Sequence, residues 1–202
     1  MKITDVVNNV KIYGFNDAVR GSKYSYALDT GAVTEEVTET VMKLAAAPIG
    51  SGHDNFLNGI IVQFDLTFTN KAWVEAERYH FLDFISSQST IHRIAKFDLD
   101  KSYISYVDPR IIAIMKKKVA QYNELAATDP QNPALNRLYL ELLYSNPAGF
   151  KLTAKMTTNY RQLKTIYAQR RTHRLPEWQI FCDWIEQLPM AECLTKPRKI
   201  ER

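Results

Sequence analysis

Polar and apolar residues alternate most regularly over residues 60–69, "IIVQFDLTFT". The apolar side of this segment consists of Val62, Phe64, Leu66 and Phe68, and the polar side consists of Gln63, Asp65 and Thr67. A period of two is typical of a β-strand that buries one face. We therefore predict a strand over residues 60–69, and a shorter one over residues 10–13, "VKIY".

The first half of the chain also contains helical patterns. After "GFND" a helix is expected to carry Ala18, Val19 and Arg20. A second helix is predicted to begin at Thr34 as its N-cap, because two glutamates follow in the first turn and Val37, Val41 and Leu44 lie on one face. A third is expected to begin at Asn70, directly after the long strand. Its aromatic-rich stripe would consist of Trp73, Ala76, Phe81 and Phe84.

Four further helices are predicted in the second half of the chain. Helices are expected at 108–125, at 133–144 with Pro133 in the first turn, at 157–171 and at 177–188. The predicted fold class is therefore α+β, a mostly helical single domain with a small antiparallel sheet. Residues 1–190 would form this domain, and residues 191–202 a basic C-terminal tail.

Charge leaves the ligand class open. The chain has 202 residues, a net charge of +4 and a sequence pI of about 8.9, which suits a phosphate-bearing ligand as well as a nucleic acid. Two basic clusters occur. Lys116 to Lys118 is expected to be a solvated helix face, and "RRTHR" at 170–174 is either a phosphate contact or a charged helix end. Nucleic-acid binding rests only on the mild basicity of the chain, on these two clusters and on the C-terminal stretch "KPRKIER".

Cysteine usage and hydropathy favour a cytoplasmic protein. Cys182 and Cys193 form no CxxC motif and are expected to be reduced, buried thiols. No apolar run reaches the ~18 residues that span a bilayer, and the N-terminus lacks the pattern of a signal peptide. The histidines show no metal-binding spacing, so no metal site is expected. GxGxxG, Walker and GxSxG motifs are also missing from the sequence.

Two polar features are candidates for ligand binding. On a continuous helix, Asn159 and Arg170 would share one face about 16 Å apart, far enough to follow a nucleotide. The alternative is that this stripe packs in the core through Leu163 and Ile166, while Asn159 caps the helix. His53 lies in a loop, "GSGHDN", where glycine permits close approach of a ligand, although a loop histidine is often only exposed.

Several segments together resemble a known family. Arg78, Tyr79 and His80 are followed by eight residues, Ser89 and then Arg93. This order is similar to the signature of the flavin-dependent thymidylate synthases, an R-H-R followed by a serine and an arginine. The stretches "DAVRGSKYSY", "GHDNFLNGIIVQFDLTF" and "TTNYRQLKTIYAQR" resemble other segments of that family in the same order.

The resemblance implies an FAD-dependent enzyme that methylates dUMP or a related pyrimidine nucleotide, with NADPH and methylenetetrahydrofolate as co-substrates. It also implies a homotetramer, with no membrane partner. The catalytic residues would be His53 and Arg170. The implied cofactor-binding residues are Ser25, His53, Asn55, Arg78, His80, Asn159 and Arg161. The implied substrate-binding residues are Ser89, Arg93 and Arg170. Arginine forks suit phosphate and carbonyl groups, and cationic donors stabilise a reduced flavin.

The chain departs from the family at four places. R-H-R is replaced by R-Y-H, Glu75 stands in place of a glutamine, and Leu143 in place of an arginine. The interval from Ser89 to Arg93 is longer than in the family. Loss of cationic and neutral ligands weakens binding of a dianionic phosphate. A non-catalytic or regulatory nucleotide-binding homologue that keeps the fold is therefore the alternative to an active enzyme.

Overall fold

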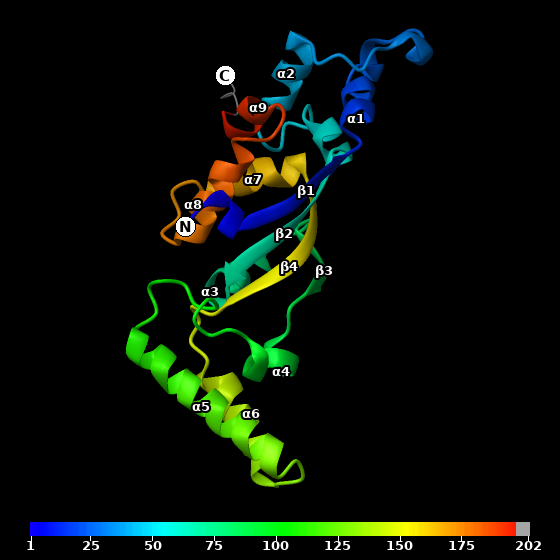
Figure 1. Cartoon of the computed structure of the whole chain (residues 1–202). Coiled ribbons are helices and arrows are strands. Elements are labelled where there is room, and N and C mark those ends of the chain that lie inside the picture. The colour runs from blue at the N-terminus through cyan, green and yellow to red at the C-terminus, as the bar shows by residue number, and fades with distance from the viewer. Residues whose placement is uncertain (197–202) are drawn as a thin grey trace. The chain divides into compact units, whose positions relative to one another are not determined.

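The computed structural model describes residues 1–196 and shows the predicted α+β class. Its four-stranded sheet has the order β1-β2-β4-β3, with β1 antiparallel to β2 (Figure 1). The strands are β1 (Val7–Tyr13), β2 (Ile61–Thr69), β3 (Asp83–Ser87) and β4 (Lys151–Asn159). The α-helices are α1 (Phe15–Gly21), α2 (Glu39–Ala45), α3 (Asn70–Ala76), α4 (Thr90–Arg93), α5 (Pro109–Thr128), α6 (Ala134–Ser145), α7 (Tyr160–Arg170), α8 (Pro176–Ile185) and α9 (Ala191–Thr195). The short 3₁₀ helices are η1 (Ile3–Asp5), η2 (Tyr24–Tyr26), η3 (Thr30–Ala32), η4 (Asn55–Gly59) and η5 (Ile94–Lys96).

The chain forms two compact units. The first contains residues 1–66, 76–86 and the part from 154 onward, and the second contains residues 67–75 and 87–153. β2 and β4 therefore contribute residues to both units. Among the described residues, no helix is both long enough and apolar enough to cross a membrane.

The strand predicted at 60–69 is confirmed as β2, and its apolar side chains form part of the core. Val62, Phe64 and Leu66 are fully buried. In the first unit the Phe64 ring lies 5.8 Å from the Phe181 ring and 4.8 Å from the Trp184 ring, measured between centroids. Aromatic pairs at these distances stabilise a core beyond the area they bury.

The helix predicted at 157–171 begins later than expected, because β4 precedes it. Asn159 has extended backbone angles and is the N-cap of α7, where its side-chain oxygen accepts a hydrogen bond from the Gln162 amide at 2.8 Å. The β4 pattern was missed because its buried apolar side chains are Ala154 and Met156, which carry a weak strand signal, and its third buried position, Thr158, is polar.

The helix predicted from Thr34 instead begins at Glu39, so Thr34 is not its N-cap. Thr38 caps α2 and accepts a hydrogen bond from the Val41 amide at 3.4 Å. Lys23 is the reason for the shorter helix: its ammonium donates to the Thr34 carbonyl at 2.9 Å and to the Glu36 carbonyl at 2.7 Å. These carbonyls are thus held by a side chain and not by a helical ladder.

The aromatic stripe predicted for the helix after Asn70 is only half correct. Trp73 and Ala76 are buried, but α3 ends at Ala76, and Phe81 and Phe84 are 64% and 45% exposed. Phe81 has a φ of 64°, a left-handed conformation that no helix continues through. The Thr158 hydroxyl donates to the Phe81 carbonyl at 2.6 Å, which ties this turn to β4 before β3 begins.

The second unit has its own core around α5 and α6, which run side by side (Figure 1). Its buried residues are Ile94, Ala95, Leu99, Tyr103, Met115, Leu142 and Phe150. Leu143, the residue that replaces a family arginine, packs against this cluster. An apolar packing role therefore accounts for Leu143 in this chain.

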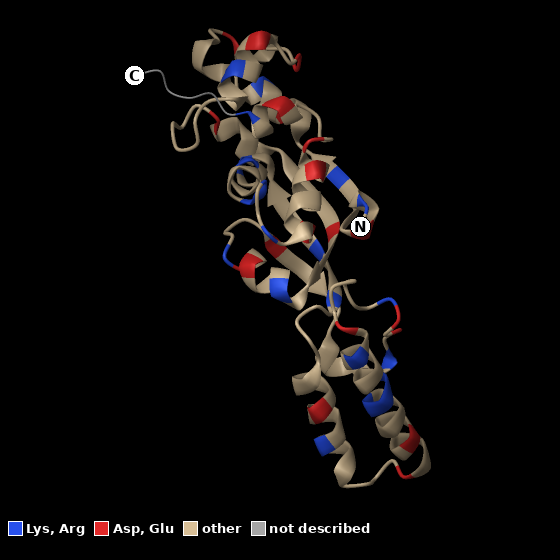
Figure 2. Ribbon diagram, turned by 90° about the vertical axis from the view of Figure 1, so that its left-hand side faces the viewer, with Lys and Arg blue, Asp and Glu red and all other residues tan. Residues whose placement is uncertain are grey.

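The lysine cluster at 116–118 belongs to a helix pair of mixed charge. Lys116 is paired with Asp100, and the Lys118 ammonium lies 3.0 Å from the Glu141 carboxylate. Figure 2 shows Asp and Glu positions among the Lys and Arg positions of α5 and α6. This alternation gives no support to nucleic-acid binding by that cluster.

The predicted C-terminal tail begins too early. Residues 191–195 form α9, and Cys193 and Leu194 are buried in the first unit. Burial of these two side chains makes the segment part of the packed structure. The remainder of the predicted tail, residues 197–202, lies outside the described part of the chain.

Gly14 is expected to tolerate no side chain. Its φ is 68°, and an added Cβ would meet the Gly59 carbonyl oxygen at 2.5 Å. We expect Gly14→Ala to lower the free energy of unfolding by roughly 1–3 kcal/mol, measured by urea denaturation. Gly21→Ala is the control, because nothing lies within 4 Å of its added Cβ. Equal stability of the two variants would contradict this account of Gly14.

Candidate functional site

A pocket in the first unit brings together three residues that the sequence assigns to the cofactor, Ser25, His53 and Asn55. We call it pocket A, and its volume is about 480 Å³. Its lining residues are Ala18, Gly21, Ser22, Ser25, His53, Asn55, Phe56 and Gly59. Ser25 comes from η2, whereas His53 comes from the loop before η4 and Asn55 is the first residue of η4. The fold therefore joins two segments that are separate in sequence.

Small residues open pocket A on the side of α1 and η4. Gly21 and Gly59 leave space on its wall, and an added Cβ at Gly59 would lie 3.3 Å from the Ala18 Cβ. Gly52 has a φ of 81°, a conformation suited to glycine, which turns the chain just before His53. The described residues that line the pocket include no Lys, Arg, Asp or Glu. Hydroxyl, imidazole and carboxamide groups supply its hydrogen bonds.

A buried ion pair lies directly behind the loop of pocket A. Asp54 and Lys164 are both 0% exposed, and the Lys164 ammonium donates to the Asp54 carboxylate at 2.8 Å. The same ammonium also donates to the Ala45 carbonyl at 2.8 Å and to the Ala47 carbonyl. The local sequence around Asp54 does not indicate this pair, because Lys164 lies 110 positions away.

Arg161 is held by the same carboxylate. Its Nε lies 3.3 Å from the second oxygen of Asp54, and its side chain is 32% exposed. Among residues 1–196, the structure records no other ion pair for this guanidinium. Arg161 is thus held by charge attraction to Asp54 without a hydrogen bond, and it is partly open to solvent.

Arg170 is engaged by its neighbours in the first unit. Its Nε donates to the Tyr79 hydroxyl at 2.7 Å, and the Tyr79 hydroxyl donates to the Gln169 side chain at 2.9 Å. The Arg170 guanidinium also lies 4.9 Å from the centroid of the Trp178 ring, which is a cation–π distance. Tyr79, the central residue of the altered R-Y-H motif, therefore binds the arginine that the sequence assigns to the substrate.

The stripe between Asn159 and Arg170 packs in the core, as the alternative interpretation of the sequence required. Leu163 and Ile166 are fully buried, and Asn159 caps α7. The two polar ends of α7 lie on opposite sides of this buried segment along the helix. A ligand that follows the whole face of α7 is thus excluded by its own packing.

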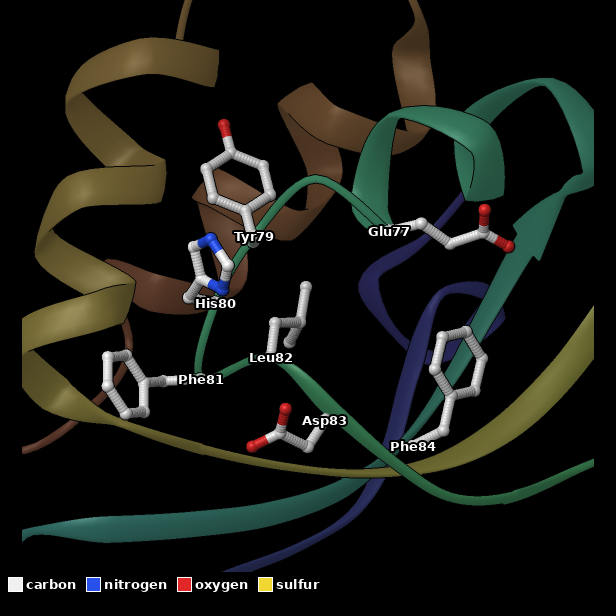
Figure 3. Close-up of a pocket in the computed structure, with 7 residues that line it drawn as sticks. All are labelled: Glu77, Tyr79, His80, Phe81, Leu82, Asp83 and Phe84. Carbon is white, nitrogen blue, oxygen red and sulfur yellow. The ribbon is translucent and has the colours of Figure 1, made fainter.

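A second pocket, pocket B, is lined by the segment that follows Ala76. Its volume is about 580 Å³, and among the predicted cofactor residues it contains His80. The lining residues are Glu77, Tyr79, His80, Phe81, Leu82, Asp83 and Phe84. Figure 3 shows the hydroxyl of Tyr79 pointing away from the carboxylate of Asp83. Arg78 is exposed and is not among the residues that line this pocket.

The remaining predicted substrate residues, Ser89 and Arg93, belong to the second unit. Ser89 is the N-cap residue of α4 but forms no capping hydrogen bond with its side chain. Arg93 is exposed at the end of the same helix. Glu75, at the family's glutamine position, lies 4.0 Å from the Lys71 ammonium.

Cys182 is expected to be chemically inert. Burial raises the pKa of its thiol to about 12, and the thiolate is the reactive form. Iodoacetamide at neutral pH should leave Cys182 unmodified in the folded protein and label it after denaturation, as measured by mass spectrometry. Labelling of Cys182 in the folded protein as fast as in the denatured protein would refute this prediction.

The described residues also contain no cluster of His, Cys, Asp and Glu that could hold a metal ion.

No protein-family model and no curated protein matches the sequence. Solved structures do match. A flavin-dependent thymidylate synthase ThyX from Helicobacter pylori, complexed with FAD and dUMP, is 15% identical, with a TM-score of 0.63 over 96% of this chain and 97% of that one. A second structure of the Helicobacter pylori enzyme is 14% identical, with a TM-score of 0.61 over 94% and 96%. The UMP/dUMP methylase PolB from Streptomyces cacaoi, bound with 5-Br dUMP, is 15% identical, with a TM-score of 0.55 over 93% and 95%. At this identity the likeness shows the fold, and it confirms the predicted flavin-dependent thymidylate synthase-like fold.

Proposed function

We propose that this chain is a divergent FAD-dependent thymidylate synthase-like enzyme that methylates dUMP or a related pyrimidine nucleotide. The observation that carries the proposal is pocket A, which unites Ser25, His53 and Asn55 from two separate segments. The fold supports it, because solved proteins with this fold bind FAD and dUMP. NADPH and methylenetetrahydrofolate are the proposed co-substrates, and a homotetramer is the proposed assembly.

The donor set of pocket A fits part of a flavin nucleotide. Neutral hydroxyl, imidazole and amide groups suit the ring heteroatoms and the ribityl hydroxyls, and Phe56 and Ala18 supply apolar contact. Arg161, anchored by Asp54 and partly exposed, would hold a negatively charged part of the cofactor. When bound, the flavin supplies the hydride chemistry. The protein binds and orients it, and the inert Cys182 has no part in the reaction.

A second function is favoured by the environment of Arg170. Its Nε is bound by Tyr79 and its guanidinium stacks on Trp178, while Leu143 packs in the second unit's core where the family has an arginine. One cationic group, Arg170, is thereby engaged in structural contacts, and a second is replaced by an apolar residue that packs in a core. These contacts support a non-catalytic or regulatory homologue that binds a flavin or nucleotide and does not turn over.

Release of tritium from dUMP labelled at C5 separates the two candidates. The purified protein would be mixed with FAD, NADPH and methylenetetrahydrofolate, and tritiated water would be counted over time. The enzyme predicts release that depends on all three additions. If the protein binds FAD but releases no tritium, the result supports the non-catalytic homologue. Rescue of a thymidine auxotroph by this protein would exclude the non-catalytic homologue.

A further inference from the structure

Asp54 lies between two residues of pocket A in the sequence, but its side chain turns the other way. His53 and Asn55 are exposed and line the pocket, whereas Asp54 is 0% exposed. We propose that Asp54 is a positioning residue that presents His53 and Asn55 to the ligand of pocket A. The identity of that ligand as FAD rests on the proposed function.

The contacts of Asp54 fix the loop to two other segments. One oxygen accepts from Lys164 of α7 at 2.8 Å, and the other lies 3.3 Å from the Nε of Arg161, one helical turn earlier. Lys164 in turn donates to the carbonyls of Ala45 and Ala47 at the end of α2. All three N–H groups of the ammonium are therefore used. The loop, α2 and α7 are joined at one point.

An ion pair between Asp54 and Lys164 restricts the position of the loop more narrowly than an apolar contact would. Removing two charges from water is costly, and apolar residues of similar size often stabilise a fold equally well. A buried carboxylate that accepts a hydrogen bond from an ammonium, with a guanidinium 3.3 Å from its other oxygen, however, accepts only a narrow range of loop positions. Asp54 also leaves one positive charge in excess at Arg161 and Lys164, which favours an anionic group nearby.

The test compares Asp54→Asn with a core variant that loses similar stability away from pocket A. Met156→Ala serves as this control, because Met156 is 0% exposed in β4 and does not line the pocket. FAD affinity would be measured by fluorescence at a temperature where both variants are folded, as judged by circular dichroism. Hydrogen–deuterium exchange of residues 50–58 would be measured without FAD. Should Asp54→Asn not fold, the double variant Asp54→Asn/Lys164→Met takes its place, because it buries no single charge.

The proposal predicts that Asp54→Asn raises the Kd for FAD at least about tenfold over Met156→Ala, and that residues 50–58 exchange faster in it. Equal Kd values for the two variants would overturn the proposal. If the wild-type protein does not bind FAD, the proposed function fails, and exchange alone decides the role of Asp54. In that case faster exchange in Asp54→Asn supports positioning, and exchange equal to that of Met156→Ala overturns it.

Discussion

Replacement of Lys164 by methionine is expected to lower the free energy of unfolding by about 3–5 kcal/mol. Methionine is unbranched and one atom shorter than lysine, so the change removes mainly the charged group. It leaves the fully buried Asp54 carboxylate without its ammonium partner, and it leaves the Ala45 and Ala47 carbonyls without their donor. A buried charge that loses its partner costs far more than a surface charge does.

Urea denaturation followed by circular dichroism measures this cost, and Lys155→Met is the matched control. Lys155 lies 3.3 Å from the Asp65 carboxylate, but the two side chains are 33% and 27% exposed. Solvent screens that pair, so we expect the control to lose no more than about 1 kcal/mol. Similar losses in the two methionine variants would mean that the Asp54–Lys164 pair has no special role in stability.

The double variant His53→Ala/Asn55→Ala is expected to raise the Kd for FAD about 10- to 100-fold without a large change in stability. Both side chains are exposed in the free protein and line pocket A, so their removal costs ligand hydrogen bonds and little packing. Loss of one or two such bonds corresponds to this range of affinity. Isothermal titration of FAD into the purified variant measures the effect.

Asn58→Ala is the control for this double variant. Asn58 belongs to the same 3₁₀ helix, η4, as Asn55 and is also exposed, but it does not line pocket A. Its replacement should leave the Kd for FAD unchanged. If Asn58→Ala raised the Kd for FAD by the same factor, the loss of affinity would come from a change in the structure of η4 and not from lost contacts in pocket A.

The sequence predicted the helices and strands in which the spacing of apolar residues follows the buried face of the same element. β2 alternates because its apolar face is fully buried, and α5 shows helical spacing because Met115 and its neighbours pack on one core. β4 and β3 were missed. Ala154, Met156 and Thr158 give β4 a weak apolar pattern, and all five residues of β3 are exposed, so that strand has no buried face to reveal it.

The candidate site could be predicted only in part for a related reason. Family-like segments identified Ser25, His53 and Asn55, and the fold brings them into one pocket. The pairing of Asp54 with Lys164 joins residues 110 positions apart, and nothing in local spacing indicates such a contact. The same is true of Tyr79 and Arg170, which are 91 positions apart.

The R-Y-H motif illustrates how a local substitution acquires its meaning from a distant residue. From the sequence, Tyr79 is a departure from a family histidine. In the structure its hydroxyl accepts from Arg170 and its ring lies 5.8 Å from that of Trp178. The substitution is thus coupled to the arginine that the sequence assigned to the substrate, and both candidate functions depend on whether that arginine remains bound to Tyr79 when a nucleotide is present.

The most direct test of the proposed function is the visible absorbance spectrum of the purified protein after incubation with FAD and removal of unbound cofactor. A flavoprotein retains a band at about 450 nm, the absorbance of the oxidised flavin ring. We predict this band in the wild-type protein and its loss in His53→Ala/Asn55→Ala. A wild-type protein that remains colourless after incubation would contradict the proposal.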